Sequence, residues 1–217
     1  MTDDNRRRFL RLLVAAPLAW GAGWKLGLTG EAAAAEALLA ASTPSAGRAA
    51  PRPAPTPECG DNDEPTPEQT EGPFYTPKTP RRTSLLEPGM AGTRIAIAGR
   101  VFSRTCRPVS GAMLDFWQAG DDGEYDNEGF RLRGHQFADS EGRWRLETVV
   151  PGLYPGRTRH IHVRVQPPAG SVLSSQLYFP NEPRNRRDGI FHSRLLMAVS
   201  EVDGRKQGRF NFVLDID

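Results

Sequence analysis

Short apolar runs that alternate with polar residues and stop at turn signals are the feature that most constrains the fold of this chain. The runs "TRIAIAGRVF" at 93–102 and "HIHVRVQ" at 160–166 have the period of two that is typical of a half-buried strand. The chain also holds 22 Gly and 19 Pro, which favour turns between short strands over long helices. Together these features predict an all-β body, a sandwich or barrel of mostly antiparallel strands with few or no helices.

Four further segments extend this prediction along the chain. Polar, Gly-rich stretches separate them, including "GDDGEYDNEG" at 120–129 and "PNEPRNRRDGIF" at 180–191, which we expect to be loops. In the last segment Phe210, Phe212 and Leu214 share one face. The expected strands are "MLDFWQA" at 113–119, "SEGRWRLETVV" at 140–150 with its hairpin turn, "SSQLYF" at 174–179 and "GRFNFVLDI" at 208–216.

The N-terminus is a different kind of sequence. "NRRRFLRLLVAAPLAW" at 5–20 places consecutive arginines before an apolar run and resembles a twin-arginine export signal. Lys25 interrupts the apolar run short of the roughly 20 residues that span a bilayer, so a stable membrane anchor is not expected, although an anchor or a basic tail is the alternative. We predict a signal peptide at 1–40 that is read by the twin-arginine export machinery. A Pro/Ala/Ser-rich linker at 41–58 and a folded domain at 59–217 then follow, in a protein that is periplasmic or secreted.

Charge and cysteine content bear on partners and on the compartment. Residues 51–217 carry 22 basic and 22 acidic side chains, which predicts no nucleic-acid partner and no anionic membrane partner. The two cysteines, Cys59 and Cys106, would form one disulfide in an exported protein, whereas they would be free thiols in a reducing compartment.

Two histidines one residue apart raise the question of a metal. On a strand, His160 and His162 project to the same side, so their imidazoles can share a cation. Such a pair more often makes only ordinary hydrogen bonds, so further residues are needed to support a metal site. Tyr125 and Tyr154 are the nearby candidates for further ligands, and a phenolate is a hard anion that suits Fe(III).

Four motifs in sequence order then carry a family resemblance. The segment from about residue 66 to 191 resembles the intradiol ring-cleavage dioxygenases, the non-haem Fe(III) family that includes protocatechuate 3,4-dioxygenase and catechol 1,2-dioxygenase. The resemblance implies a transthyretin-like β-sandwich that cleaves a catechol-type diol with O₂ to a cis,cis-muconate type product. The motifs are "TPEQTEGPFY" at 66–75, "GAMLDFWQAGDDGEYDN" at 111–127, "GLYPGRTRHIHV" at 152–163 and "SSQLYFP" at 174–180.

The resemblance also implies roles for individual residues. Tyr125, Tyr154, His160 and His162 match the ferric ligands of the family, and Tyr154 matches the tyrosinate that leaves the metal when substrate binds. We therefore expect Tyr154 to take part in catalysis as well as in metal binding.

A second group of residues matches the substrate side of the family's site. Arg157 and Gln176 match a catalytic arginine and the glutamine beside it. Here Thr158 and Arg159 directly precede the first histidine, where many family members have a longer loop, so Arg159 is an alternative to Arg157 in the substrate pocket. Tyr75 is a further candidate for that pocket.

Two other function classes stay open at this point. A cupin-like Zn or Fe(II) enzyme would use the histidines but not the tyrosines, and a transthyretin-like binding module would have no catalysis. The sequence leaves open which catechol is the substrate and whether the chain forms a homo-oligomer.

Overall fold

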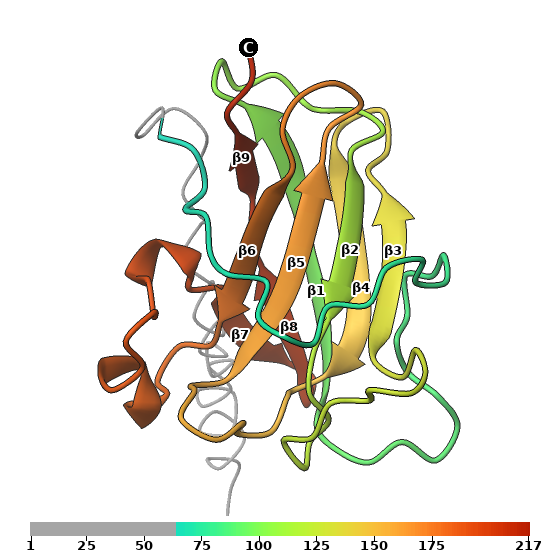
Figure 1. Ribbon diagram of the computed structural model, residues 1–217, viewed down its shortest axis with the longest axis vertical. Helices are drawn as coiled ribbons and strands as arrows, with labels where there is room; N and C mark the ends of the chain where they lie inside the picture. Colours follow the sequence, from blue (N-terminus) through green and yellow to red (C-terminus); the bar gives the residue numbers. More distant parts are fainter. Residues whose placement is uncertain (1–63) are drawn as a thin grey trace, which may run out of the picture. The chain divides into compact units, whose positions relative to one another are not determined.

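The computed structural model describes residues 64–217, which fold into two packed β-sheets (Figure 1). The predicted all-β class is confirmed. The predicted signal peptide, the linker and Cys59 lie outside the described residues, so the disulfide between Cys59 and Cys106 stays a prediction. The strands are β1 (Arg94–Ser103), β2 (Met113–Trp117), β3 (Arg133–Phe137), β4 (Arg143–Val149), β5 (His160–Gln166), β6 (Leu173–Tyr178), β7 (Ala198–Val202), β8 (Arg205–Arg209) and β9 (Phe212–Leu214).

The two sheets differ in how their strands pair. One sheet has the order β3-β2-β5-β6 and is antiparallel throughout. The other has the order β4-β1-β8-β7, with β1 parallel to β8 and also to β9. The alternating apolar residues of both sheets face each other and form the core, which includes Ile97, Leu114, Phe116, Leu146 and Ile161.

The strand expected at 208–216 is divided in two. β8 ends at Arg209 and β9 begins at Phe212, because the carbonyl oxygen of Phe210 lies over Gly99 of β1. A Cβ at Gly99 would lie 1.6 Å from that oxygen, so only glycine fits there. The three apolar side chains expected on one face are all buried. The interruption depends on a neighbouring strand, which a local pattern does not reveal.

Helical structure in the described residues is limited to two 3₁₀ turns, η1 (Pro183–Arg186) and η2 (Ser193–Leu195). η1 lies within the segment 180–191 that we expected to be a loop. No helix in residues 64–217 is long and apolar enough to cross a membrane.

An extended segment that precedes β1 covers the outer face of the β3-β2-β5-β6 sheet (Figure 1). It begins beside β6, where the Gln69 amide donates to the Ser174 carbonyl at 2.8 Å. It ends beside β3, where the Arg82 amide donates to the His135 carbonyl at 2.9 Å. Side chains that would face solvent in a bare sandwich are therefore buried under this segment.

Candidate metal centre

Strand register lines up the polar residues of the covered face. His162 on β5 lies opposite Trp117 on β2 and Gln176 on β6, and His160 lies opposite Tyr178. Residues directly opposite each other in an antiparallel pair point to the same side of the sheet. His160 and His162 are 4% and 3% exposed, so both imidazoles are held beneath the covering layer.

Tyr125 reaches this face from the loop between β2 and β3. Glycines let that loop pack backbone to backbone against the segment that precedes β5: the Gly152 amide donates to the Gly120 carbonyl at 2.6 Å. A Cβ at Gly152 would lie 2.3 Å from the Gly123 nitrogen. This close approach brings Tyr125 to the histidines, with its ring stacked on Phe74 at 4.4 Å between centroids.

Two other potential ligand atoms lie close to Nε2 of His160. The Tyr125 hydroxyl lies 3.2 Å from Nε2 of His160, which lies 3.2 Å from Nε2 of His162. Ligand atoms about 2.1 Å from a shared ion and near right angles to each other are about 3 Å apart, so this spacing fits a metal. Nδ1 of His160 lies 2.7 Å from the Thr158 carbonyl oxygen, so it carries the proton and leaves the Nε2 lone pair toward the cluster.

Burial determines the charge state of the three groups. Burial, with a smaller contribution from Arg157, lowers the pKa of His160 to about 4. Burial and the neighbouring His160 lower the pKa of His162 well below its ordinary value. Burial also raises the pKa of the Tyr125 phenol, and the positive charges of Arg157 and Arg133 offset that rise only in part. Both imidazoles are therefore neutral at pH 7. The phenol ionises only beside a cation that lowers its pKa more than Arg157 and Arg133 do.

Tyr154 lies at the edge of the same cluster. Its ring packs edge-on against Tyr125 at 5.7 Å and against Phe74 at 5.4 Å between centroids. It is half-buried, whereas Tyr125 is buried. The ring of Tyr154, a predicted ligand, therefore contacts the cluster. Of the two tyrosines, however, it is Tyr125 whose hydroxyl lies within hydrogen-bond distance of a histidine.

Arg157 and Gln176 meet beside the histidines, as expected for neighbours in one site. The Arg157 guanidinium donates to Gln176 Oε1 at 2.6 Å and to Asp188 Oδ2 at 2.8 Å. Gln176 in turn donates to the Thr70 carbonyl at 3.0 Å, which ties this pair to the covering segment.

Asp188 is a site residue that sequence reasoning missed. Burial raises its pKa, but the hydrogen bonds from the Thr158 amide and from Arg157 outweigh this, so the pKa lies below the ordinary value. Asp188 is thus an ionised, buried partner that holds Arg157. No local pattern marks it, because it lies in a polar loop 31 residues from Arg157.

The two remaining pocket candidates, Arg159 and Tyr75, contact different residues. Arg159 forms an ion pair with Glu182 at 2.8 Å and donates to the Pro151 carbonyl. Tyr75 packs against Trp117 at 4.9 Å and donates from its hydroxyl to Asp115 at 3.3 Å. Arg157, rather than Arg159, therefore contacts the glutamine beside the histidines.

Arg133 and Tyr178 complete the surroundings and were not expected from the sequence. Arg133 is 1% exposed and donates to the backbone carbonyls of Asp126 and Phe74, so it joins the Tyr125 loop to the covering segment. The Tyr178 hydroxyl lies 3.3 Å from the Arg157 guanidinium, and burial raises its pKa to about 12.

Comparison with known proteins places this arrangement in a family. A family model described as "Dioxygenase" matches residues 70–216. The solved dioxygenase domain of a dioxygenase and carbohydrate-binding protein fusion from Streptomyces sp. SirexAA-E is 51% identical with a TM-score of 0.69. The match covers 71% of this chain and 100% of that chain.

Curated relatives agree with this result. Catechol 1,2-dioxygenase of Candida albicans is 27% identical over 179 residues, which cover 67% of this chain and 59% of that protein. The protocatechuate 3,4-dioxygenase beta chain of Burkholderia cepacia is 34% identical over 118 residues, which cover 46% of this chain and 50% of that protein. The chain thus spans between 50% and 59% of the length of these two relatives. The family model covers most of the chain, and these relatives bear the names that the four motifs led us to expect, so the chain belongs to the dioxygenase family.

Proposed function

We propose that the chain is a non-haem Fe(III)-dependent intradiol dioxygenase. It cleaves a catechol-type diol between its hydroxyls with both atoms of O₂ and forms a cis,cis-muconate type diacid. The observation that carries this proposal is that the Tyr125 hydroxyl and Nε2 of His162 each lie 3.2 Å from Nε2 of His160. Family membership supports it independently.

The chemistry of these side chains favours a ferric ion. Two neutral imidazoles bring no charge, and a buried phenol with a raised pKa ionises only beside a strongly charged cation. Tyr125, Tyr154, His160 and His162 would hold the ion. A ferric ion in this site would supply the charge that keeps the bound diol as a catecholate and makes its ring reactive toward O₂.

The protein side chains then have separate tasks. Tyr154 is half-buried and therefore the tyrosine that an incoming diol reaches first, which suits it to accept a hydroxyl proton. Arg157 stabilises the negative charge that develops on the ring and on the cleaved product. Asp188 and Gln176 hold the Arg157 guanidinium in place, and Phe74 and Trp117 keep water from the ligand atoms.

Metal analysis and spectroscopy of purified protein test this proposal. We expect one iron per chain, a red-brown colour from tyrosinate-to-iron charge transfer, and oxygen uptake with at least one of catechol, protocatechuate or hydroxyquinol. Tyr125→Phe should lose iron and colour, whereas the matched variant Tyr178→Phe should keep both, because its hydroxyl contacts Arg157 and not the histidines.

The same measurements discriminate the alternatives. A colourless protein loaded with zinc or iron would favour the cupin-like enzyme, in which the tyrosines are not ligands. A protein that consumes no oxygen with any catechol would favour the transthyretin-like binding module.

We also propose that the mature enzyme works outside the cytoplasm, on the basis of the arginine-rich leader at 1–40. Replacement of Arg6 and Arg7 by lysine should retain the protein in the cytoplasm with an uncleaved leader. Fractionation and intact mass measure this, and export of the lysine variant to the same extent as the unaltered protein would contradict it.

A further inference from the structure

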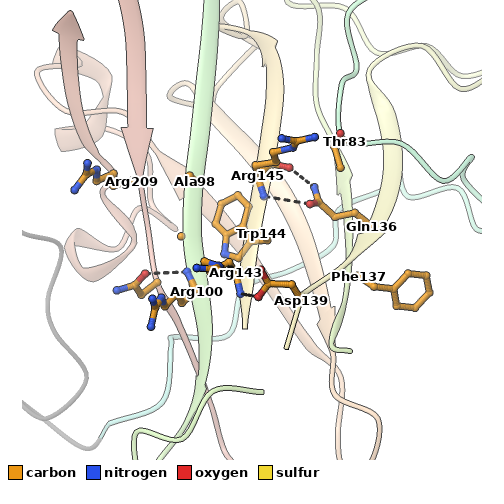
Figure 2. A pocket seen from close by; sticks show the side chains of 12 residues that line it. Thr83, Ala98, Arg100, Gln136, Phe137, Asp139, Arg143, Trp144, Arg145 and Arg209 are labelled. Carbon is orange, nitrogen blue, oxygen red and sulfur yellow. Dashed lines mark hydrogen bonds and ion pairs between the residues drawn. The ribbon is translucent and has the colours of Figure 1, made fainter. Parts of the chain in front are cut away.

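A broad groove lies on the sheet remote from the metal ligands. It has a volume of about 810 Å³ and is formed by β1 and β4, with residues from β3 and from Arg209 and Asn211 at its margins (Figure 2). Ala98 lies in the middle of it, and its small side chain leaves the hollow, whereas the position of a Cβ at Gly99 is directed at the Phe210 carbonyl.

Strand register surrounds this hollow with arginines. Arg145 of β4 and Arg209 of β8 are both paired with Ala98 of β1, so the two guanidiniums project on either side of it (Figure 2). Arg143 is directly opposite Arg100 in the neighbouring pair of the ladder. The alternation of β4, where Trp144 and Leu146 are buried, turns Arg143 and Arg145 to one face, with Glu147 beyond them on the same strand.

Most of this positive charge is not neutralised by the described residues. Arg143 pairs with Asp139 at 2.8 Å and also contacts Glu141. Arg100, Arg145 and Arg209 form no ion pair within residues 64–217. Like charges directly opposite each other in a sheet are destabilising. Asp139 and Glu141 offset part of the repulsion between Arg100 and Arg143, and a bound anion would offset more of it.

We propose that this groove binds an acidic polysaccharide, a sugar polymer that carries carboxylate groups. Arginine guanidiniums bind carboxylates through paired hydrogen bonds, and three unpaired ones around a hollow favour a ligand with several carboxylates. Exposed Arg94 on β1 and Arg205 on β8 continue the same face beyond the groove, which favours an extended polymer over a compact anion.

The aromatic residues of the groove argue against a single-stranded nucleic acid, which is the other polymer with repeated charges. Such strands are held by exposed rings on which bases stack. Trp144 is 3% exposed, and the Phe137 ring at the margin is already occupied by the guanidinium of Arg81, 5.2 Å from its centroid. The groove therefore offers charge without a central stacking surface.

Binding of polygalacturonate to the full-length protein, measured by titration calorimetry, tests the proposal. We expect affinity to fall as NaCl rises from about 0.05 to about 0.2 M, because salt screens exposed charges. Arg145→Ser with Arg209→Ser should weaken binding about tenfold or more, equivalent to at least about 1.4 kcal/mol. Arg184→Ser with Arg186→Ser removes the same charge from η1 and should change affinity less than about twofold.

Ala98→Glu provides a second variant, because this exposed position places a carboxylate in the hollow without removing any native contact of the arginines. It should weaken binding to a similar extent, with oxygen uptake on catechol unchanged. No binding by the unaltered protein would overturn the proposal, as would equal losses in the η1 control. Tighter binding of single-stranded DNA than of polygalacturonate would overturn it as well.

Discussion

The outer faces of the two sheets differ in exposure, because other segments of the described chain cover one of them and leave the other open to solvent. The face of the β3-β2-β5-β6 sheet lies under residues 69–82 and the loops around Tyr125 and Asp188, and its polar side chains are buried in short hydrogen bonds. The face of the β4-β1-β8 strands presents arginines to solvent around Ala98. A covering layer removes water, shifts pKa values and aligns ligand atoms, whereas a bare face leaves its charges available to a soluble anion.

Charge is divided between the faces in the same way. The loop that carries Tyr125 contains five acidic residues between 121 and 128, close to the covered site. The groove face carries arginines from three strands. The equal numbers of acidic and basic residues in 51–217 therefore do not mean that each surface is neutral. The sequence-based expectation of no polyanion partner concerned nucleic acid and membranes, and our proposal for the groove concerns a different polymer.

The largest effect is expected from Arg157→Ala on the covered face. Loss of a guanidinium that stabilises developing negative charge should lower kcat about 10²–10³-fold. Iron content and colour should be retained, because Arg157 contacts Gln176 and Asp188 rather than the ligand atoms. Arg159→Ala is the matched control, since its partner is Glu182. A larger loss of kcat in Arg159→Ala than in Arg157→Ala would indicate that Arg159 has the catalytic role.

Glycine substitutions compare the two faces directly. Gly152→Ala on the covered side and Gly99→Ala on the bare side each place a Cβ within 2.3 Å of backbone atoms, so both should cost about 3 kcal/mol of unfolding free energy. Only Gly152→Ala should also alter the visible spectrum, because it separates the Tyr125 loop from the segment before β5. Chemical denaturation and absorbance measure the two effects, and identical spectra would contradict the comparison.

Asp188→Asn should have a smaller effect on stability. It keeps the shape of the side chain but removes the charge that pairs with Arg157, which should cost about 2 kcal/mol and roughly 4–8 °C in Tm for a domain of this size. It should also raise KM for catechols, because the guanidinium is less firmly held. A variant with unchanged Tm and unchanged KM would show that Gln176 and Tyr178 are sufficient to hold Arg157.

The smallest effect concerns pH and the buried Asp115. Burial raises the pKa of Asp115, although the hydrogen bond from Thr79 at 2.7 Å acts in the opposite direction. A carboxyl group whose folded pKa is raised binds its proton more tightly in the native state. Its contribution to stability is therefore present at low pH and is lost as pH rises through the folded pKa.

Asp115→Asn should consequently gain in Tm relative to the unaltered protein as pH rises from about 4 to about 7. The gain should be no more than a few degrees. Differential scanning fluorimetry across this pH range measures it, with Asp203→Asn in an exposed turn as the control. A difference in Tm that does not change with pH would contradict the raised pKa.

The fold was largely predictable where a strand has its own alternating pattern. β1, β2, β4, β5 and β6 all coincide with expected segments. β3 was missed because its buried residues include Arg133 and Gln136, so it lacks an apolar pattern. β7 was missed, and β8 was predicted only at residues 208–209, for a related reason: the exposed and half-exposed residues of both strands outnumber the buried ones.

The site was predictable to the extent that its residues lie in motifs. The shared side of His160 and His162 follows from strand geometry, Tyr125 and Tyr154 were candidates for further ligands, and the family resemblance added Arg157 and Gln176. The residues that hold these groups, Asp188 and Arg133, have no motif. They contact their partners across the sheet or between loops, so their positions depend on pairings that no local window contains.

The sequence by itself determined the all-β class, the side to which each strand residue points and the candidate ligand types, because side-chain alternation is a property of the local backbone. Only the tertiary structure decided that Tyr125 comes within 3.2 Å of His160, that Asp188 is the partner of Arg157, and that arginines from β1, β4 and β8 share one face. These outcomes depend on strand register and loop packing, which are set by the fit of the whole core and covering layer rather than by neighbours in the chain.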